Sequence, residues 1–188
     1  RDPRQVVEAV LEGIRNTGHE EVSLLSLSSA DHSCILEMAR ALRRELDPEG
    51  VSLSLPSTRI DAFDVDLVRE IGSVRRSGFT LAPEAGTMAL RRAINKRVDE
   101  ERFYEVVEKV LAAGWRTIKL YFMCGLPGET EADLDGIVEV TRRVAEMGRR
   151  RCGRNFKLNV SLSPFVPKPH TPFQWHAQPT LGELQEKY

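Results

Sequence analysis

Thr117-Ile-Lys-Leu-Tyr-Phe-Met-Cys-Gly-Leu-Pro-Gly-Glu-Thr130 is the segment that most clearly indicates the fold class of this chain. Its first half, through Met123, is the most apolar of the predicted strands. An exit containing glycine and proline follows, and Thr130 with Asp133 then forms the capping-box signature that begins a helix. The stretch therefore predicts a strand, a turn and a helix in succession.

The same alternation extends in both directions. Further strands are predicted at residues 22–27, 51–55, 79–82 and 157–163. Helices are predicted from Asp2 to Gly18, over 35–46, after Asp64, over 87–94, from Asp99 to Gly114, from Thr130 to Gly148 and after Thr180. Strict alternation with long connections favours a parallel sheet, and no Gly-rich dinucleotide-binding fingerprint follows any strand. We therefore predict an α/β fold, specifically a partial (β/α)6 TIM-like barrel with its functional groups at the C-terminal strand ends.

The predicted organisation is one barrel followed by a short extension. Residues 1–175 are expected to form the barrel core, strands two to six, and residues 176–188 the start of a C-terminal extension or final helix. Arg1 leads into a helix without a preceding strand, and Tyr188 ends the chain inside another helix. We therefore expect a piece of a longer protein, truncated at its N-terminus, whose first strand lies upstream.

Composition excludes several functional classes. The 188 residues include 27 Lys and Arg against 28 Asp and Glu, and this balance argues against nucleic acid or membrane as a general partner. No apolar run is long enough for a membrane span, so a soluble cytoplasmic protein is expected. The basic cluster of Arg149, Arg150, Arg151 and Arg154 is interpreted as a solvated helix end, with anion binding as the alternative. Cys34, Cys124 and Cys152 lie too far apart to share a metal site and are interpreted as reduced thiols.

The predicted strand ends are rich in small and hydroxyl residues and carry few charges. Glu84 supplies a carboxylate and Arg59 a cation, a combination that suits a zwitterionic or polyhydroxylated ligand. An ordinary salt bridge involving these residues is the alternative interpretation. No histidine or carboxylate pair is grouped there, so acid–base hydrolysis is not favoured and no catalytic residue is assigned.

Three segments carry a family resemblance. Gly78-Phe-Thr-Leu-Ala-Pro-Glu-Ala-Gly86, continued by the helix that closes in Asn95-Lys96, resembles the fourth-strand segment of radical SAM enzymes. Ile118 to Thr130, with its Gly-Leu-Pro-Gly-Glu-Thr exit, resembles their fifth strand, and Leu162 to Trp175 resembles their sixth. The last segment, with Leu53-Ser-Leu-Pro-Ser57, most resembles the subgroup in which a cobalamin-binding domain precedes the radical SAM domain. The resemblance covers essentially the whole chain.

The resemblance implies a domain that binds S-adenosylmethionine and a [4Fe–4S] cluster and generates a 5′-deoxyadenosyl radical. Ser28 and Ser29 match the second-strand exit that holds the methionine amino group, although many members have Gly-Gly-Glu there. Glu84 matches the residue facing the methionine or ribose. Met123 and Gly125 match positions that line adenine, and Phe165 matches a position that packs on it. The implied cofactor-binding set is Ser28, Ser29, Arg59, Glu84, Gly86, Met123, Gly125 and Phe165.

The family's cluster ligands form a Cys-x-x-x-Cys-x-x-Cys loop after the first strand, and this chain has no such spacing. The resemblance therefore implies that the loop, and a cobalamin-binding domain in the named subgroup, lie upstream of Arg1. The isolated fragment is expected to be inactive. The resemblance leaves open whether cobalamin is used and whether the substrate is RNA, a protein or a small molecule.

Two other functions remain open from the residues alone. A non-redox TIM-type barrel lyase would hold a phosphorylated substrate through backbone amides at a late strand end, where the Pro-rich exit of residues 164–172 removes donors. A catalytically dead barrel that binds RNA or protein would use the arginine cluster at Arg149–Arg154 as its contact, and its binding would depend on salt.

Overall fold

The computed structural model describes residues 2–26, 32–54 and 78–188. The first described part contains α1 (Pro3–Thr17), β1 (Glu21–Ser23), α2 (Ile35–Leu46), the 3-10 turn η2 (Asp47–Glu49) and β2 (Ser52–Ser54). The predicted first helix is confirmed, because the Asp2 side chain accepts a hydrogen bond from the Arg4 N–H and the helix ends at Gly18 in the left-handed conformation. β1 and β2 pair in parallel, with Val22 opposite Leu53.

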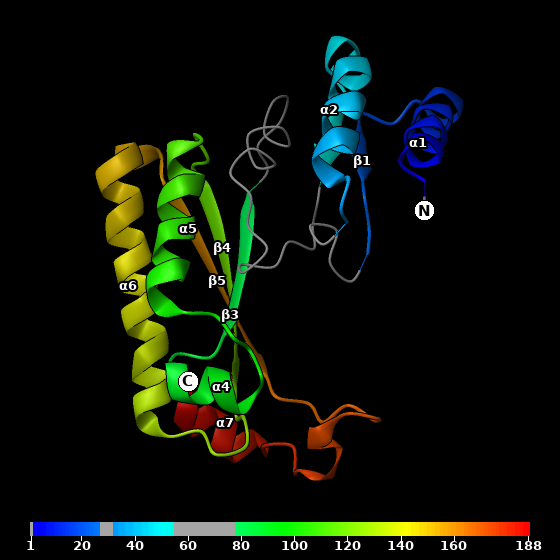
Figure 1. The fold of residues 1–188 in the computed structure, drawn as a ribbon. Helices are drawn as coiled ribbons and strands as arrows, with labels where there is room; N and C mark the ends of the chain where they lie inside the picture. The colour runs from blue at the N-terminus through cyan, green and yellow to red at the C-terminus, as the bar shows by residue number, and fades with distance from the viewer. Residues whose placement is uncertain (1, 27–31, 55–77) are drawn as a thin grey trace.

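The second described part follows the same alternation. It consists of β3 (Phe79–Glu84), α4 (Met88–Ala93), α5 (Glu100–Ala112), β4 (Thr117–Cys124), α6 (Glu131–Cys152), η3 (Gly153–Asn155), β5 (Lys157–Pro164), η4 (Pro172–Trp175) and α7 (Leu181–Lys187). β3, β4 and β5 form a parallel sheet in that order, and α5 and α6 lie side by side along it (Figure 1). The short loops after β3 and β4 therefore lie at the same end of the sheet.

The core of this second part lies between the sheet and the two long helices. Along β4, Ile118, Leu120 and Phe122 are buried in the cluster that includes the apolar face of α5. The intervening side chains point to the opposite face of the sheet, where Tyr121 is exposed. Within the described residues, one face of the sheet is therefore core and the other carries the exposed Tyr121.

The expected α/β class with parallel strands is confirmed, but barrel closure is not observed in the described ranges. There the five strands form one two-stranded and one three-stranded sheet. The helix predicted after Asp64 lies outside the described residues. The expected division at residues 175 and 176 stays a prediction.

The predicted helix end at Gly148 is wrong. α6 continues to Cys152, and Arg149, Arg150 and Arg151 lie in its last turn. Gly148 is buried inside the helix because the ring of Phe156 packs on it, in the space that a Cβ would occupy. This glycine is therefore explained by packing and not by helix termination. No helix in the described part of the chain is long and apolar enough to cross a membrane.

Candidate functional site

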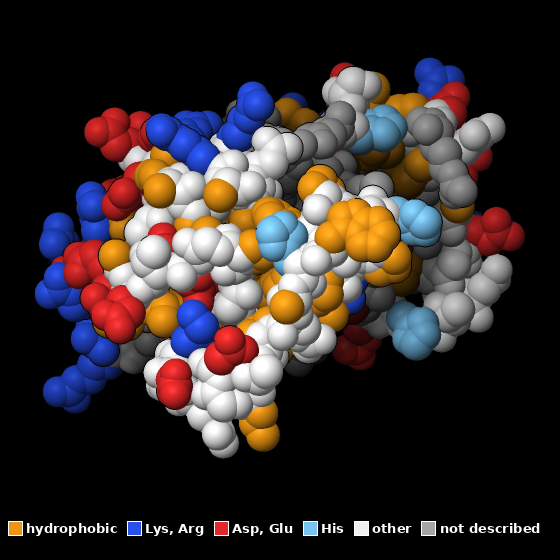
Figure 2. Space-filling view, turned by 90° about the horizontal axis from the view of Figure 1, so that it is seen from below, with side chains coloured by type: hydrophobic (Ala, Val, Ile, Leu, Met, Phe, Trp, Pro, Cys, Tyr) orange, Lys and Arg blue, Asp and Glu red, His pale blue; other side chains and the backbone are white. Residues whose placement is uncertain are grey.

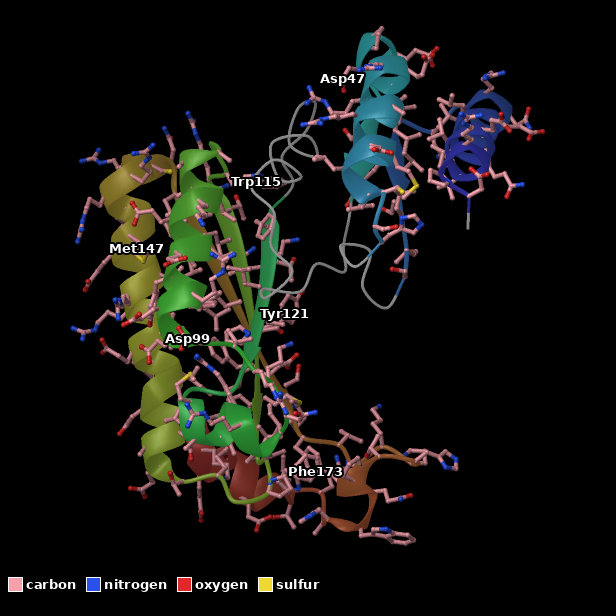
Figure 3. The ribbon with its side chains drawn as sticks, in the orientation of Figure 1. Asp47, Asp99, Trp115, Tyr121, Met147 and Phe173 are labelled. Carbon is pink, nitrogen blue, oxygen red and sulfur yellow. The ribbon has the colours of Figure 1, made fainter. Side chains whose placement is uncertain are left out.

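The C-terminal ends of β3, β4 and β5 meet at the lower end of the sheet in Figure 1. In Figure 3, Trp115 lies at the opposite end of the sheet, Tyr121 near its middle, and Phe173 below the strand ends. Parallel strands bring the groups that follow them to one edge, and this edge is where α/β enzymes bind ligands. We therefore call this region the strand-end site.

Glu84 ends β3 in an unusual backbone conformation. A β-bulge shifts the register between Leu81 and Glu84, so that Glu84 lies opposite Phe122 of β4. The backbone φ of Glu84 is 70°, in the left-handed region that non-glycine residues rarely adopt. Bulges and left-handed residues of this kind are concentrated next to functional sites, where they redirect a side chain.

The Glu84 carboxylate has a cationic partner. Lys96 Nζ lies 3.4 Å from Glu84 Oε1, and the two side chains are 33% and 28% exposed. The pair thus presents a carboxylate and an ammonium side by side with access to solvent. Such a pair complements a ligand that carries both charges, because the carboxylate can accept from an ammonium and the ammonium can donate to a carboxylate.

The turn after Glu84 is fixed by contacts with α6. The Thr87 hydroxyl donates to the carboxylate of Asp133, which also accepts hydrogen bonds from the Thr130 N–H and hydroxyl. Burial raises the pKa of Asp133, but these hydrogen bonds outweigh burial, so the pKa lies below its ordinary value. Asp133 therefore completes the capping box at the start of α6 and ties this helix to the exit of β3.

The exit of β4 forms a loop closed by Glu129. The Gly125 N–H donates to both carboxylate oxygens of Glu129, at 2.9 and 3.0 Å. The Glu129 side chain is only 2% exposed, and Lys187 Nζ of α7 lies 2.7 Å from its Oε1. The hydrogen bond to Glu129 raises the pKa of Lys187, although burial opposes the shift. Gly125 has a φ of 76°, and Pro179 Cγ lies 2.5 Å from where a Cβ of Gly125 would be.

A small apolar cluster completes this end of the sheet. Ala85, Leu90, Leu126 and Phe165 are buried together, and Met123 and Phe173 pack against them. The rings of Phe165 and Phe173 meet edge to face with centroids 6.0 Å apart. Figure 2, which views the molecule from this end, shows hydrophobic side chains exposed among histidines. Trp175 is 86% exposed there and Leu181 is 73% exposed.

The strand-end site brings together five of the eight predicted ligand-binding residues: Glu84, Gly86, Met123, Gly125 and Phe165. Ser28, Ser29 and Arg59 lie outside the described residues. Phe165 is buried in the apolar cluster, and Gly86 packs against the backbone of α6. Their predicted contacts with a cofactor stay predictions.

Sequence reasoning missed three charged residues of this site: Lys96, Glu129 and Lys187. Lys96 stands in the Asn-Lys ending already noted, so a signal for it was present. Glu129 lies within the Gly-Leu-Pro-Gly-Glu-Thr exit, but nothing local indicated that its partner would be Lys187, 58 residues further on.

The cysteines do not form a cluster site. Cys34, Cys124 and Cys152 are all free, and Cys124 is buried. Within residues 2–26, 32–54 and 78–188, no group of three His, Cys, Asp or Glu side chains is arranged to hold a metal ion. An iron–sulfur cluster would therefore need ligands from beyond these residues.

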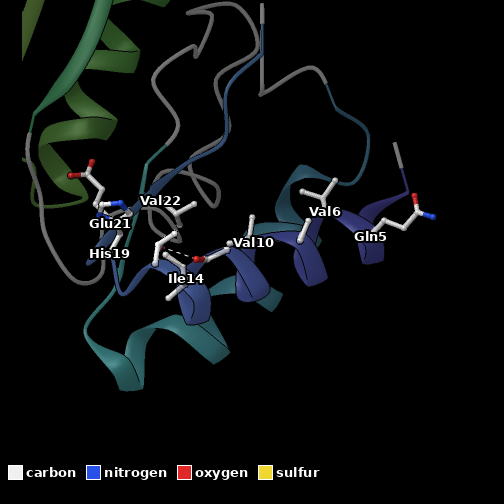
Figure 4. Close-up of a pocket in the computed structure, with 10 residues that line it drawn as sticks. Gln5, Val6, Val10, Ile14, His19, Glu21 and Val22 are labelled. Atoms are coloured by element: carbon white, nitrogen blue, oxygen red, sulfur yellow. Dashed lines mark hydrogen bonds between the residues drawn. The ribbon is translucent and has the colours of Figure 1, made fainter.

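A separate groove of about 650 Å³ lies between α1 and β1, with Val6, Val10 and Ile14 on one wall (Figure 4). His19 and Glu21 are at one end of it. Its lining is mainly apolar and offers no paired charges comparable to Glu84 and Lys96. The strand-end site is therefore the better candidate for a charged ligand.

Comparisons with known proteins agree with this architecture. A curated relative, "Uncharacterized protein MJ0966" of Methanocaldococcus jannaschii, is 32% identical over 163 residues, which are 87% of this chain and 34% of the relative. The chain thus spans about a third of that relative's length. The structure of coproporphyrinogen III oxidase (HemN) from Escherichia coli, described as a radical SAM enzyme, superposes with a TM-score of 0.58 at 15% identity, covering 98% of this chain and 44% of that chain.

The likeness to HemN shows the fold, and the family assignment comes from a sequence model. The model of the radical SAM superfamily matches residues 1–141, three quarters of the chain. The parallel α/β arrangement is consistent with that match. The chain therefore belongs to the radical SAM superfamily.

Proposed function

We propose that this chain forms part of the catalytic domain of a radical SAM enzyme and binds S-adenosylmethionine at the strand-end site. The observation that carries the proposal is the pair of opposite charges on Glu84 and Lys96, 3.4 Å apart and open to solvent. Family membership supports an enzyme that uses S-adenosylmethionine and a [4Fe–4S] cluster. It does not favour a catalytically dead binding module or a non-redox lyase.

The methionine part of the ligand is a zwitterion. Its ammonium would donate to the Glu84 carboxylate, and its carboxylate would accept from Lys96 Nζ. Each charge-assisted hydrogen bond contributes about 1.5–3 kcal/mol. Lys96 thus supplies, within the described residues, the cation that Arg59 was expected to contribute.

The adenosine part would lie against the apolar side of the site. Met123 and Phe173, which are partly buried against the apolar cluster, offer a low-polarity surface. Apolar side chains line most of the surface that a ligand contacts in enzyme pockets. The Glu129 carboxylate fixes the Gly125 backbone, so this wall is preorganised before a ligand arrives.

The cluster would be held by cysteines outside this sequence, since Cys34, Cys124 and Cys152 are separated. A bound cluster would supply the electron that breaks the C5′–S bond of S-adenosylmethionine and gives methionine and a 5′-deoxyadenosyl radical. The residues of this chain bind and orient the nucleoside. A cobalamin-binding domain upstream remains a prediction of the resemblance, and so does the absence of activity in this chain alone.

The proposal is tested on the full-length protein reconstituted with iron and sulfide. Calorimetric titration with S-adenosylmethionine should show that Glu84→Gln lowers the affinity at least about tenfold. A loss of this size corresponds to one charge-assisted hydrogen bond. Glu105→Gln is the matched control, because Glu105 pairs with Arg102 on the exposed side of α5. Equal affinity in the wild type and Glu84→Gln, or no 5′-deoxyadenosine after reduction, would overturn the proposal.

A further inference from the structure

Arg91 is a fully buried cation in α4. Its side chain is 0% exposed, and in the described residues it forms no ion pair. Its Nε donates to the Ala85 carbonyl oxygen at 2.8 Å, and Nη2 lies 3.4 Å from the Gly86 carbonyl oxygen. Burial lowers the pKa of Arg91, and the nearby charge of Glu100 offsets this only in part. Burying an arginine is costly, so its position requires an explanation.

The two carbonyls that Arg91 holds immediately follow Glu84. Glu84 adopts the left-handed backbone after the β-bulge, and a glutamate keeps that conformation only where its surroundings enforce it. Arg91 contacts the turn from α4, and the backbone of α6 packs against Gly86. The turn is therefore clamped between two elements.

We infer that Arg91 is a positioning residue: its guanidinium holds the Ala85–Gly86 turn so that Glu84 keeps its left-handed backbone and presents its carboxylate beside Lys96. This inference rests on the proposed function of Glu84 in binding S-adenosylmethionine. Arg91 itself is buried and does not touch the ligand.

A purely structural role for Arg91 makes different predictions. Its guanidinium also lies 5.9 Å from the centre of the Phe103 ring, so it contributes to the core between α4 and α5. If this were its whole role, replacing Arg91 would lower the stability of the protein. It would leave unchanged the difference in stability between glycine and alanine at position 84. It would also leave ligand affinity unchanged in the fraction of protein that folds.

A stability cycle at position 84 tests the clamp without any ligand. Glu84→Ala and Glu84→Gly both remove the ion pair with Lys96, but only glycine relieves a left-handed backbone. In wild type, Glu84→Gly should therefore unfold at a higher urea midpoint than Glu84→Ala. In Arg91→Met the turn can relax, and the difference between the two midpoints should vanish or reverse.

Arg91→Lys is the second background, for the case in which Arg91→Met does not fold. Lysine keeps a charge but cannot reach both carbonyls with a planar group. The difference between glycine and alanine at position 84 should shrink in this background too. The inference would be overturned if the difference between the Glu84→Gly and Glu84→Ala midpoints were the same as in wild type in every Arg91 variant that folds.

Ligand titration of the reconstituted full-length protein supplies the second readout. Arg91→Lys should weaken S-adenosylmethionine binding about tenfold when Glu84 is present, and should have no further effect in Glu84→Gln. Val107→Ala is the control for general destabilisation, because it would create a cavity on the buried face of α5. It should leave the affinity for S-adenosylmethionine unchanged.

The two readouts separate the two hypotheses. If Glu84→Gln leaves affinity unchanged, the proposed function fails, and the stability cycle still decides whether Arg91 holds the turn. If Glu84→Gln weakens binding but Arg91→Lys does not, the proposed function stands and the inference about Arg91 is overturned.

Discussion

Gly86, in the turn after β3, packs directly against Gly136 in α6. A Cβ on Gly136 would lie 2.9 Å from the carbonyl carbon of Gly86, and a Cβ on Gly86 would overlap the carbonyl oxygen of Asp133. The two backbones approach this closely because neither residue has a side chain. The contact places the N-terminal turn of α6 beside the strand-end site.

Gly86→Ala should therefore be strongly destabilising. The atoms that a new methyl group would meet are backbone atoms of α6, which cannot move aside as a flexible side chain can, so a loss of about 3 kcal/mol or more is expected. Gly13→Ala is the control, since position 13 lies within α1 with no atom near its missing Cβ. This variant should be neutral or more stable by up to about 1 kcal/mol. Urea unfolding measures both, and equal midpoints would contradict the packing role of Gly86.

Local signals in the sequence correctly predicted where several helices begin. Asp2, Asp99, Thr130 and Thr180 each cap the helix expected of them, because a capping residue acts on backbone N–H groups only two or three residues away. The parallel orientation of the strands likewise followed from the alternation of strands and helices. These features depend on short stretches of chain and can be read without knowing the tertiary structure.

Features that depend on distant contacts were not predictable. Gly148 was expected to end α6, but the ring of Phe156 explains it. The left-handed backbone of Glu84 and its pairing with Lys96 depend on a bulge, a turn and the packing of α4 and α6. Glu84 was nevertheless singled out from its position after a strand, but its role in ligand binding stays a prediction, and its backbone geometry and pairing were not foreseen.

Asp133 should make the stability of the fold depend on pH in the acidic range. Burial raises the pKa of Asp133, but the hydrogen bonds from Thr87 and Thr130 together outweigh it, so the pKa lies below that of an unfolded Asp, about 3.9. The resulting stabilisation is complete above the unfolded pKa and is lost as the pH falls through the lower folded pKa. Urea unfolding between pH 2 and 7 should show this loss in wild type and a smaller one in Asp133→Asn.

The same variant should cost about 1–3 kcal/mol at neutral pH, because an asparagine cannot accept all the bonds that Asp133 accepts. Asp99→Asn is the control, since the side chain of Asp99 accepts a single capping hydrogen bond from the Arg102 N–H. It should cost less than Asp133→Asn. A larger loss in the control would argue against Asp133 as the link between α6 and the turn after β3.

Lys187 should anchor α7 through the buried carboxylate of Glu129. Lys187→Met leaves that carboxylate without its cation and should cost about 1–3 kcal/mol in urea unfolding, since Lys187 is partly exposed and water replaces part of the interaction. The double variant Lys187→Met with Glu129→Gln should lose less than the sum of the single losses. Additive losses would show that the two residues act independently.

Thiol labelling gives a local readout of the same contact. Cys124 is fully buried and lies beside Lys187 and Tyr188. In the full-length protein, with labelling followed by mass spectrometry of the peptide that contains Cys124, this thiol should react slowly with an aromatic disulfide reagent. Lys187→Met should raise the rate at least several-fold, because loosening α7 uncovers the end of β4. A rate equal to that of the parent protein would mean that α7 stays in place without the ion pair.

Variants of Lys96 distinguish an ordinary salt bridge with Glu84 from a ligand site. Ion pairs this exposed contribute about 0–1 kcal/mol to stability, so Lys96→Met should barely change the urea midpoint. If Lys96 donates to the carboxylate of S-adenosylmethionine, the same variant should lower affinity about tenfold, and Lys96→Arg should retain most of it because arginine also donates to carboxylates. A variant that lost stability but kept affinity would assign Lys96 to the fold alone. The small energetic role expected in the free protein is what makes a large loss of binding informative, because it cannot be attributed to unfolding.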